Sequence, residues 1–118
     1  MHRYQILMEY VGTNFYGWQY QKKQITIQGT VEKALKKILK EKVKLYGSGR
    51  TDSKVHAVEQ SAHFDVKNKI NNIRRFSNSL NFFLNRKFIT VVKINKRPLT
   101  FHARYSAKKR VYKYLIHK

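Results

Sequence analysis

Apolar and polar residues alternate along much of this chain, and the period of the alternation changes from one segment to the next. Near the N-terminus, apolar side chains occupy every second position: Tyr4, Ile6, Met8 and Tyr10. A period of two places one side of an extended chain against a core and leaves the other side in polar surroundings. The pattern therefore predicts a strand with one buried face.

The next segment has the period of a helix. From about Thr26, apolar residues recur three or four positions apart: Ile27, Val31, Ala34, Leu35 and Ile38. Between them lie four lysines: Lys33, Lys36, Lys37 and Lys40. This spacing predicts an amphipathic helix that packs its apolar stripe on the core and leaves the lysines in solvent.

Strand-like alternation returns after this helix. Val43 and Leu45 suggest a short strand that runs into the turn Gly47-Ser48-Gly49. Beyond it, one set of side chains is expected to face the core: Val58, Ala62, Phe64 and Val66. The intervening set is expected to face the other way: Glu59, Ser61, His63 and Asp65. The pattern predicts a second long strand.

The second half of the chain continues with a helix and two further strands. The helical stripe consists of Ile70, Ile73, Ser77, Leu80 and Leu84. A β-branched run from Phe88 to Ile94 predicts a strand that Pro98 closes, and residues 110–116 alternate again. The order β-α-β-β-α-β is that of the α+β ferredoxin-like (split βαβ) fold, an antiparallel sheet with two helices on one face. In RRM domains the open face of such a sheet receives RNA, although fold analogy does not establish function.

Composition narrows the class of partner. With 118 residues, the chain is expected to form one domain. Its 26 Lys and Arg against six Asp and Glu give a formal net charge of +20, so a polyphosphate is the leading expectation. A membrane partner is disfavoured because the basic residues are spread along the chain and no segment approaches about 20 apolar residues. The sequence has no cysteine and no apolar leader, so we expect no thiolate metal site and a cytoplasmic location.

One acidic residue stands out in this basic chain. Asp52 follows Arg50 and Thr51 directly after the glycine-rich turn. One interpretation is a nucleophilic or acid/base carboxylate that positive surroundings keep ionised. The other is a turn aspartate that bonds nearby backbone or pairs with Arg50, and from these four residues alone the turn interpretation is favoured.

Longer motifs carry a resemblance to a known family. Gly49-Arg50-Thr51-Asp52, Val55-His56-Ala57 and Gln60-x-x-His63-Phe64-Asp65 together resemble the active-site motif of the tRNA pseudouridine synthase A (TruA) family. Further blocks occur in the family's order and at about its spacing: Glu9-Tyr10-x-Gly12 with Phe15-Tyr16-Gly17-Trp18-Gln19, Thr30-Val31-Glu32-Lys33-Ala34-Leu35, Leu80-Asn81-x-x-Leu84, Phe101-His102-Ala103-Arg104-Tyr105-Ser106-Ala107 and Arg110-x-Tyr112-x-Tyr114. The resemblance extends from residue 9 to residue 116 and corresponds to the N-terminal half of the family.

The resemblance implies isomerisation of uridine to pseudouridine at positions 38–40 of the tRNA anticodon stem-loop, without a cofactor. It implies that Asp52 is the nucleophile and that Arg50 helps to hold the place of the flipped base. Tyr112 matches a tyrosine that stacks on the target uracil, although by its alternating pattern alone it would be a core residue. The family acts as a homodimer with tRNA lying across both subunits, so a homodimer or a complementing domain is also implied.

Other residues are candidates for RNA contact. Those near the motifs are Trp18, Lys22, Lys23, Thr51, Lys54, His56, Arg104, Lys108, Lys109 and Arg110. Further candidates for backbone phosphates are Arg74, Arg75, Arg86 and Lys87. The alternative for Trp18 is a packed loop anchor, and for any single lysine it is simple solvation. His56, His63 and His102 lack the close spacing of a zinc site and are expected to fix backbone near the active-site turn or to contact phosphates.

Two departures from the family pattern leave alternatives open. Lys54 stands where the family usually has glycine, and a positive φ there would cost of order 1 kcal/mol. The family is also about twice as long, so we expect residues 1–118 to form a single catalytic-type domain without the C-terminal domain that completes the cleft. The chain is therefore either the N-terminal half of a synthase, completed by another chain or domain, or a catalytically incomplete RNA-binding fragment. An unrelated basic ribosome-type protein is disfavoured by the collinear blocks.

Overall fold

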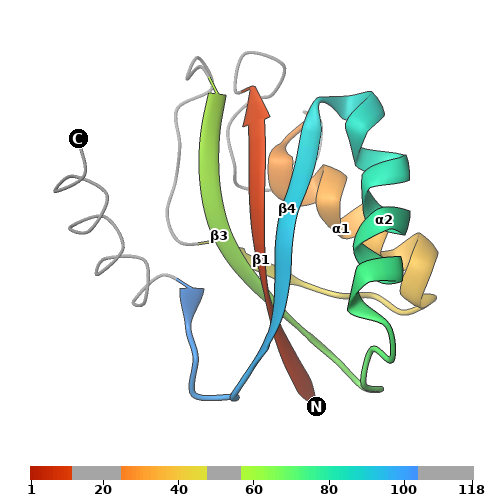
Figure 1. The fold of residues 1–118 in the computed structure, drawn as a ribbon, viewed down its shortest axis with the longest axis vertical. Helices are drawn as coiled ribbons and strands as arrows, with labels where there is room; N and C mark the ends of the chain where they lie inside the picture. The colour runs from red at the N-terminus through yellow and green to blue at the C-terminus, as the bar shows by residue number, and fades with distance from the viewer. Residues whose placement is uncertain (12–24, 48–56, 104–118) are drawn as a thin grey trace, which may run out of the picture.

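The computed structural model describes residues 1–11, 25–47 and 57–103. The elements follow the order β1 (His2–Val11), α1 (Ile27–Leu39), β2 (Leu45–Gly47), β3 (Ala57–Val66), α2 (Ile73–Leu84), the 3-10 helix η2 (Asn85–Lys87) and β4 (Ile89–Arg97) (Figure 1). This sequence of strands and helices confirms the predicted order. The additional strand predicted at residues 110–116 lies outside the described residues.

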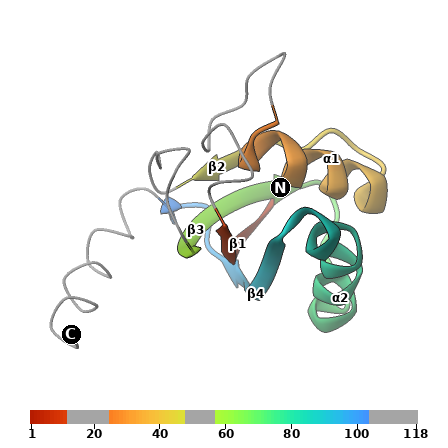
Figure 2. The ribbon, with the colours of Figure 1, turned by 90° about the horizontal axis from the view of Figure 1, so that it is seen from above.

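The four strands form one sheet in the order β2-β3-β1-β4. Each neighbouring pair is antiparallel, with β1 between β3 and β4. Both helices lie on the same side of the sheet (Figure 2). This topology confirms the ferredoxin-like α+β fold. No helix in the described part of the chain is both long enough and apolar enough to cross a membrane.

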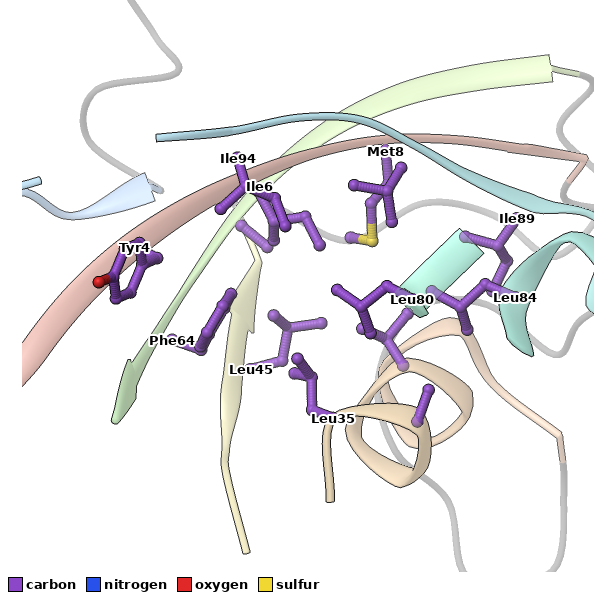
Figure 3. Packing of buried hydrophobic residues seen from close by; sticks show 14 of the residues in the cluster. Tyr4, Ile6, Met8, Leu35, Leu45, Phe64, Leu80, Leu84, Ile89 and Ile94 are labelled. Atoms are coloured by element: carbon purple, nitrogen blue, oxygen red, sulfur yellow. The ribbon is translucent and has the colours of Figure 1, made fainter. Parts of the chain in front are cut away.

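The core lies between the sheet and the two helices (Figure 3). The alternating residues of β1 reach it as predicted, since Tyr4, Ile6 and Met8 are fully buried. Leu35 of α1 and Leu80 of α2 pack against them. Burying a large apolar side chain contributes roughly 1.5–3 kcal/mol, so this face of β1 supplies much of the stability of the fold.

Polar side chains mark where both helices begin. Thr26 caps α1, because its hydroxyl oxygen accepts a hydrogen bond of 3.2 Å from the backbone N–H of Gly29. Asn72 caps α2 in the same way through the N–H of Arg75, at 3.0 Å. The second helix therefore starts after Ile70, which the sequence pattern had placed on its stripe. The backbone N–H of Ile70 instead donates to the hydroxyl of Tyr4, at 2.9 Å.

The entry to β4 also differs from the predicted strand. Phe88, expected to begin it, adopts a left-handed conformation (φ 64°), and its side chain is exposed. Its N–H donates to the carbonyl of Asn85, which closes η2. A non-glycine residue in this region costs of order 1 kcal/mol. The turn redirects the chain so that Ile89, not Phe88, is the first β4 side chain in the core.

Asn81 ties α2 to β4 beside an irregularity in the sheet. The pairing of β1 with β4 shifts register between Leu7 and Met8, which pair with Lys93 and Val91. The side-chain oxygen of Asn81 accepts from the N–H of Val91 at 2.7 Å, and its amide nitrogen donates to the Val91 carbonyl at 3.1 Å. One side chain thus satisfies both backbone groups of a buried residue.

We expect Asn81→Ala to lower the free energy of unfolding by about 1–3 kcal/mol, because both backbone groups of Val91 lose their partner. Asn78, an exposed asparagine of the same helix, provides the matched control. Asn78→Ala is expected to change stability by no more than about 0.5 kcal/mol. Chemical denaturation of the two variants measures the difference, and equal values would contradict the role given to Asn81.

Candidate active site

The expected catalytic residues and the RNA-contact candidates near the motifs fall in three segments outside the described residues. Residues 12–24 include Trp18, Lys22 and Lys23. Residues 48–56 include Arg50, Thr51, Asp52, Lys54 and His56. Residues 104–118 include Arg104, Lys108, Lys109, Arg110 and Tyr112. Their mutual arrangement therefore stays a prediction, whereas the framework that flanks them is described.

Two of these segments are anchored at one end of the sheet. Val11, the last residue of β1, is paired with Ala57, the first residue of β3. Residues 12–24 follow Val11, and residues 48–56 precede Ala57. The two segments therefore join the sheet at a pair of neighbouring residues. Asp52 is five positions from Gly47 and five from Ala57 along the chain. The motif that contains it connects two neighbouring strands of a well-formed sheet.

The side of the sheet away from the helices carries a polar network, which we call the polar face: Arg3, Gln5, Ser61, His63, Asp65 and Arg97. Gln5 lies at its centre. Its amide nitrogen donates to the hydroxyl of Ser61 at 2.8 Å, and its oxygen accepts from Nε of Arg97 at 2.9 Å. These bonds link β3, β1 and β4 across the sheet.

Arg3 holds the chain that follows β4 against the polar face. Its Nε and Nη2 donate to the two carboxylate oxygens of Asp65, at 2.8 and 3.0 Å. Its Nη1 donates to the carbonyls of Leu99 and Phe101, at 2.7 and 2.5 Å. The pKa of Asp65 is lowered, chiefly by the hydrogen bonds from Arg3. The guanidinium therefore joins β1, β3 and the segment 98–103, which we call the return segment, in one charge-assisted unit.

His63 makes the second attachment of the return segment. Its ring is 1% exposed, and Nδ1 accepts a hydrogen bond of 3.2 Å from the backbone N–H of Ala103. The ring stacks on Tyr46, with centroids 5.0 Å apart, and meets the edges of Phe101 and His102. An Nδ1 that accepts a hydrogen bond is unprotonated, so the geometry requires a neutral ring.

The surroundings of His63 favour the same neutral form. Burial, together with the nearby charges of Arg3 and His102, lowers the pKa of His63 to about 4. Asp65 opposes this shift but does not outweigh it. Of the two roles expected for His63, fixing backbone or contacting phosphate, the structure gives it a backbone role. The backbone that it holds is Ala103, immediately before Arg104.

The polar face is less open than expected from the fold. The sequence pattern predicted that Ser61 and His63 would lie on a face free to receive RNA, but both are buried. The hydrogen bonds of Arg3 and His63 bring the return segment back over the side of the sheet opposite the helices (Figure 2). Glu9 and Glu59, paired across β1 and β3 next to Val11 and Ala57, stay exposed. The accessible part of this face is thus nearer the strand ends that flank the Asp52 motif.

The partners in this network do not follow from the sequence pattern. Alternation placed Gln5 between the buried residues of β1 and put Ser61, His63 and Asp65 on one face. Arg3 and Asp65 are 62 positions apart, and Gln5 and Arg97 are 92 apart, so no local signal joins them.

We expect the free energy of unfolding to decrease as the pH is lowered from about 6.5 to about 4. In the unfolded chain His63 takes up a proton near its ordinary pKa of 6.5, whereas the folded protein resists protonation down to about 4. The lowered pKa of Asp65 adds a further loss only near and below its ordinary value of 3.8. Urea denaturation at a series of pH values measures the trend, and His63→Gln should flatten it between pH 6.5 and 4. A His63 ring that titrates near pH 6.5 in NMR spectra would contradict this prediction.

Arg3→Lys should loosen the return segment. Lysine keeps the charge but lacks the planar fork that reaches Asp65 and two carbonyls together. We expect the amide of Ala103 to exchange its hydrogen at least about fivefold faster, the equivalent of about 1 kcal/mol. Lys96→Arg, at an exposed position of β4, is the control and should leave the exchange of Ala103 unchanged. Equal protection in the two variants would show that Arg3 does not hold the segment.

Comparison with known proteins gives matches that cover nearly all of this chain. Residues 6–106 match the model of a family described as tRNA pseudouridine synthase. A protein named tRNA pseudouridine synthase A from Pelagibacter ubique is 59% identical over 116 residues, which cover 98% of this chain and 47% of that protein. The protein of the same name from Thermoanaerobacter sp. is 45% identical over 116 residues, with the same coverage. That from Brachyspira hyodysenteriae is 41% identical over 117 residues, 99% of this chain and 47% of the relative.

The chain therefore spans about half the length of the curated relatives that it matches. The matched range begins inside β1 and extends past the return segment, so it includes most of the described sheet, both helices and the Asp52 motif. A match of this extent, together with the ferredoxin-like topology, shows that the chain belongs to the tRNA pseudouridine synthase family.

Proposed function

We propose that this chain is the N-terminal catalytic domain of a tRNA pseudouridine synthase that isomerises uridine to pseudouridine in the anticodon stem-loop, at positions 38–40. The observation that carries the proposal is the family match over residues 6–106, because this range contains Gly49-Arg50-Thr51-Asp52 and both strands that flank it. The names of the relatives support tRNA as the substrate class.

The reaction needs a nucleophile but no external reagent. The bond between ribose C1′ and uracil N1 breaks, the ring turns, and a bond between C1′ and C5 forms. The hydrogen on C5 leaves as a proton, and N1 gains a proton, so atoms and electrons balance. We assign the nucleophilic role to Asp52, whose carboxylate attacks either the uracil ring or C1′. This role accounts for an acidic residue at the centre of a basic motif.

The target uridine must leave its stack to reach Asp52, which costs a few kcal/mol. Arg50 is assigned to the vacated position, because its planar guanidinium both stacks and contacts phosphate. Tyr112 is assigned to stacking on the extruded uracil. The other basic and aromatic candidates in the three flanking segments would contact the RNA around this site.

The described framework supports this arrangement in two ways. β1 and β3 are paired at the end where residues 12–24 begin and residues 48–56 end. On the same side of the sheet as His63, the return segment is held up to Ala103, directly before Arg104 and nine positions before Tyr112. The first feature favours a site at this end of the sheet, and the second favours a site on the polar face. We further propose a cytoplasmic enzyme that acts as a homodimer, or with a complementing domain, on a tRNA bound across the assembly.

A second function is favoured by one observation. Because the chain spans 47% of its relatives, the domain described here could bind RNA without catalysing the reaction. In that case a catalytically incomplete RNA-binding fragment would retain affinity for tRNA but not isomerise uridine. The retention of Asp52 favours the enzyme, since a carboxylate weakens a surface that only binds polyanions.

Release of tritium from tRNA labelled with [5-³H]uridine tests the proposal, because formation of the C5–C1′ bond liberates the hydrogen on C5. We expect release by the protein and a loss of at least about 1,000-fold in Asp52→Ala. Glu41→Gln is the matched control, since Glu41 accepts from the backbone N–H of Lys67 and glutamine keeps an acceptor there. Activity that survives in Asp52→Ala would refute the assigned nucleophile. Absence of release with tRNA still bound would establish the binding fragment.

A further inference from the structure

A second basic surface lies on the side of the sheet that carries the helices. The first helix, the end of α2 and η2 line a cavity of about 340 Å³. We call it the helix groove, and its lining residues are Thr30, Lys33, Ala34, Lys37, Phe83, Leu84, Arg86 and Lys87. Both helices lie on one side of the sheet (Figure 2) and the polar face is on the other, so the groove and the polar face are on opposite sides. A contact made here would therefore be separate from the proposed active site.

Every ionisable residue that lines the helix groove is basic: Lys33, Lys37, Arg86 and Lys87. The described acidic residues lie elsewhere. Glu32 accepts from the N–H of Leu45, Glu41 from the N–H of Lys67, and Asp65 from Arg3. Glu9 and Glu59 are in the ladder between β1 and β3. Among residues 1–11, 25–47 and 57–103 the one ion pair is Arg3 with Asp65, so the four groove cations concentrate positive charge that no described acid neutralises.

Aromatic rings position two of these cations. The Nζ of Lys37 lies over the ring of Phe83, 5.5 Å from its centroid. The guanidinium of Arg86 lies over the ring of Phe82 at 5.0 Å. The two rings meet edge to face, with centroids 5.4 Å apart. Cation-π contacts of this kind restrain flexible side chains, which lowers the entropy lost when a ligand binds. The restraint of Lys37 and Arg86 by these rings distinguishes the groove from a surface of freely solvated lysines.

We propose that the helix groove binds phosphate groups of the RNA backbone and forms a second contact for the substrate, opposite the polar face. The proposal rests on the proposed function, which makes RNA the polyanion that this domain meets. Lysine and arginine are the principal partners of backbone phosphates, and a concave wall brings several of them to neighbouring phosphates together. Phe82, which is 61% exposed and lies under the guanidinium of Arg86, adds a surface on which an unpaired base can stack.

The slope of tRNA affinity against salt concentration tests the proposal. Lys37→Gln with Arg86→Gln removes two groove cations, whereas Lys67→Gln with Lys69→Gln removes two exposed cations after β3, outside the groove lining. Both pairs change the net charge equally. We expect the log-log slope of the groove variant to be shallower by about 1.4–1.8, the value for two lost phosphate contacts, and that of the control to stay near the wild type. Equal slopes in the two variants would overturn the proposal.

The source of the phosphate is tested by titrating the wild type and the groove variant with inorganic phosphate in a chloride buffer. If the groove binds the RNA backbone, the groove variant has the shallower tRNA slope whether or not the wild type also binds inorganic phosphate. If the wild type binds inorganic phosphate and the groove variant does not, while both bind tRNA with the same salt slope, the groove is a site for free phosphate and the RNA assignment is wrong. If the groove variant binds tRNA as the wild type does at every salt concentration, the groove serves another partner, such as an acidic protein, and the proposal also fails.

The salt slope of tRNA binding does not depend on catalysis, so the groove and the proposed function are tested separately. A shallower slope in the groove variant without tritium release by the wild type would uphold the groove and refute the proposed function. Tritium release with an unchanged slope in the groove variant would uphold the function and refute the groove.

Discussion

The alternation of side chains along β1 is the constraint on which the rest of this structure depends. β1 lies between β3 and β4, so its residues from Arg3 to Tyr10 have a partner on both sides. One set, which includes Tyr4 and Ile6, enters the core beneath the helices. The other set, Arg3 and Gln5, enters the polar network and fastens the return segment. A shift of one residue in register would exchange the two sets and lose both the core and the network.

This division gives the domain two chemically different sides. The polar face is held together by charge-assisted and neutral hydrogen bonds around Arg3, Gln5 and His63, and the return segment covers part of it. The helical side has the groove, with cations that the described acids do not neutralise. Arginine therefore has two roles here. Arg3 stabilises the fold through its hydrogen bonds to Asp65 and the return segment, whereas Arg86 is exposed and available to a ligand. A net charge of +20 alone does not separate these roles.

The sequence predicted the fold well because its signals are local. Period-two and helical patterns located β1, α1 and β3, and Thr26 marked the start of α1. Errors arose where a single hydrogen bond or a turn decided the outcome, as at Ile70 and Phe88. The covered polar face was not predicted, since it depends on contacts between residues 40 or more positions apart. Motif resemblance, not periodicity, identified Asp52, because the physical signal of a turn aspartate and that of a nucleophile are the same in sequence.

The central claim is that Asp52 is a nucleophile directed at RNA and not a turn residue paired with Arg50. A crystal structure of the protein bound to an anticodon stem-loop tests it most directly. The account predicts an extruded uridine on the side of the polar face, with its reacting carbon about 3–3.5 Å from the carboxylate of Asp52. RNA bound with all its uridines stacked, and Asp52 turned away from it in an ion pair with Arg50, would contradict the claim.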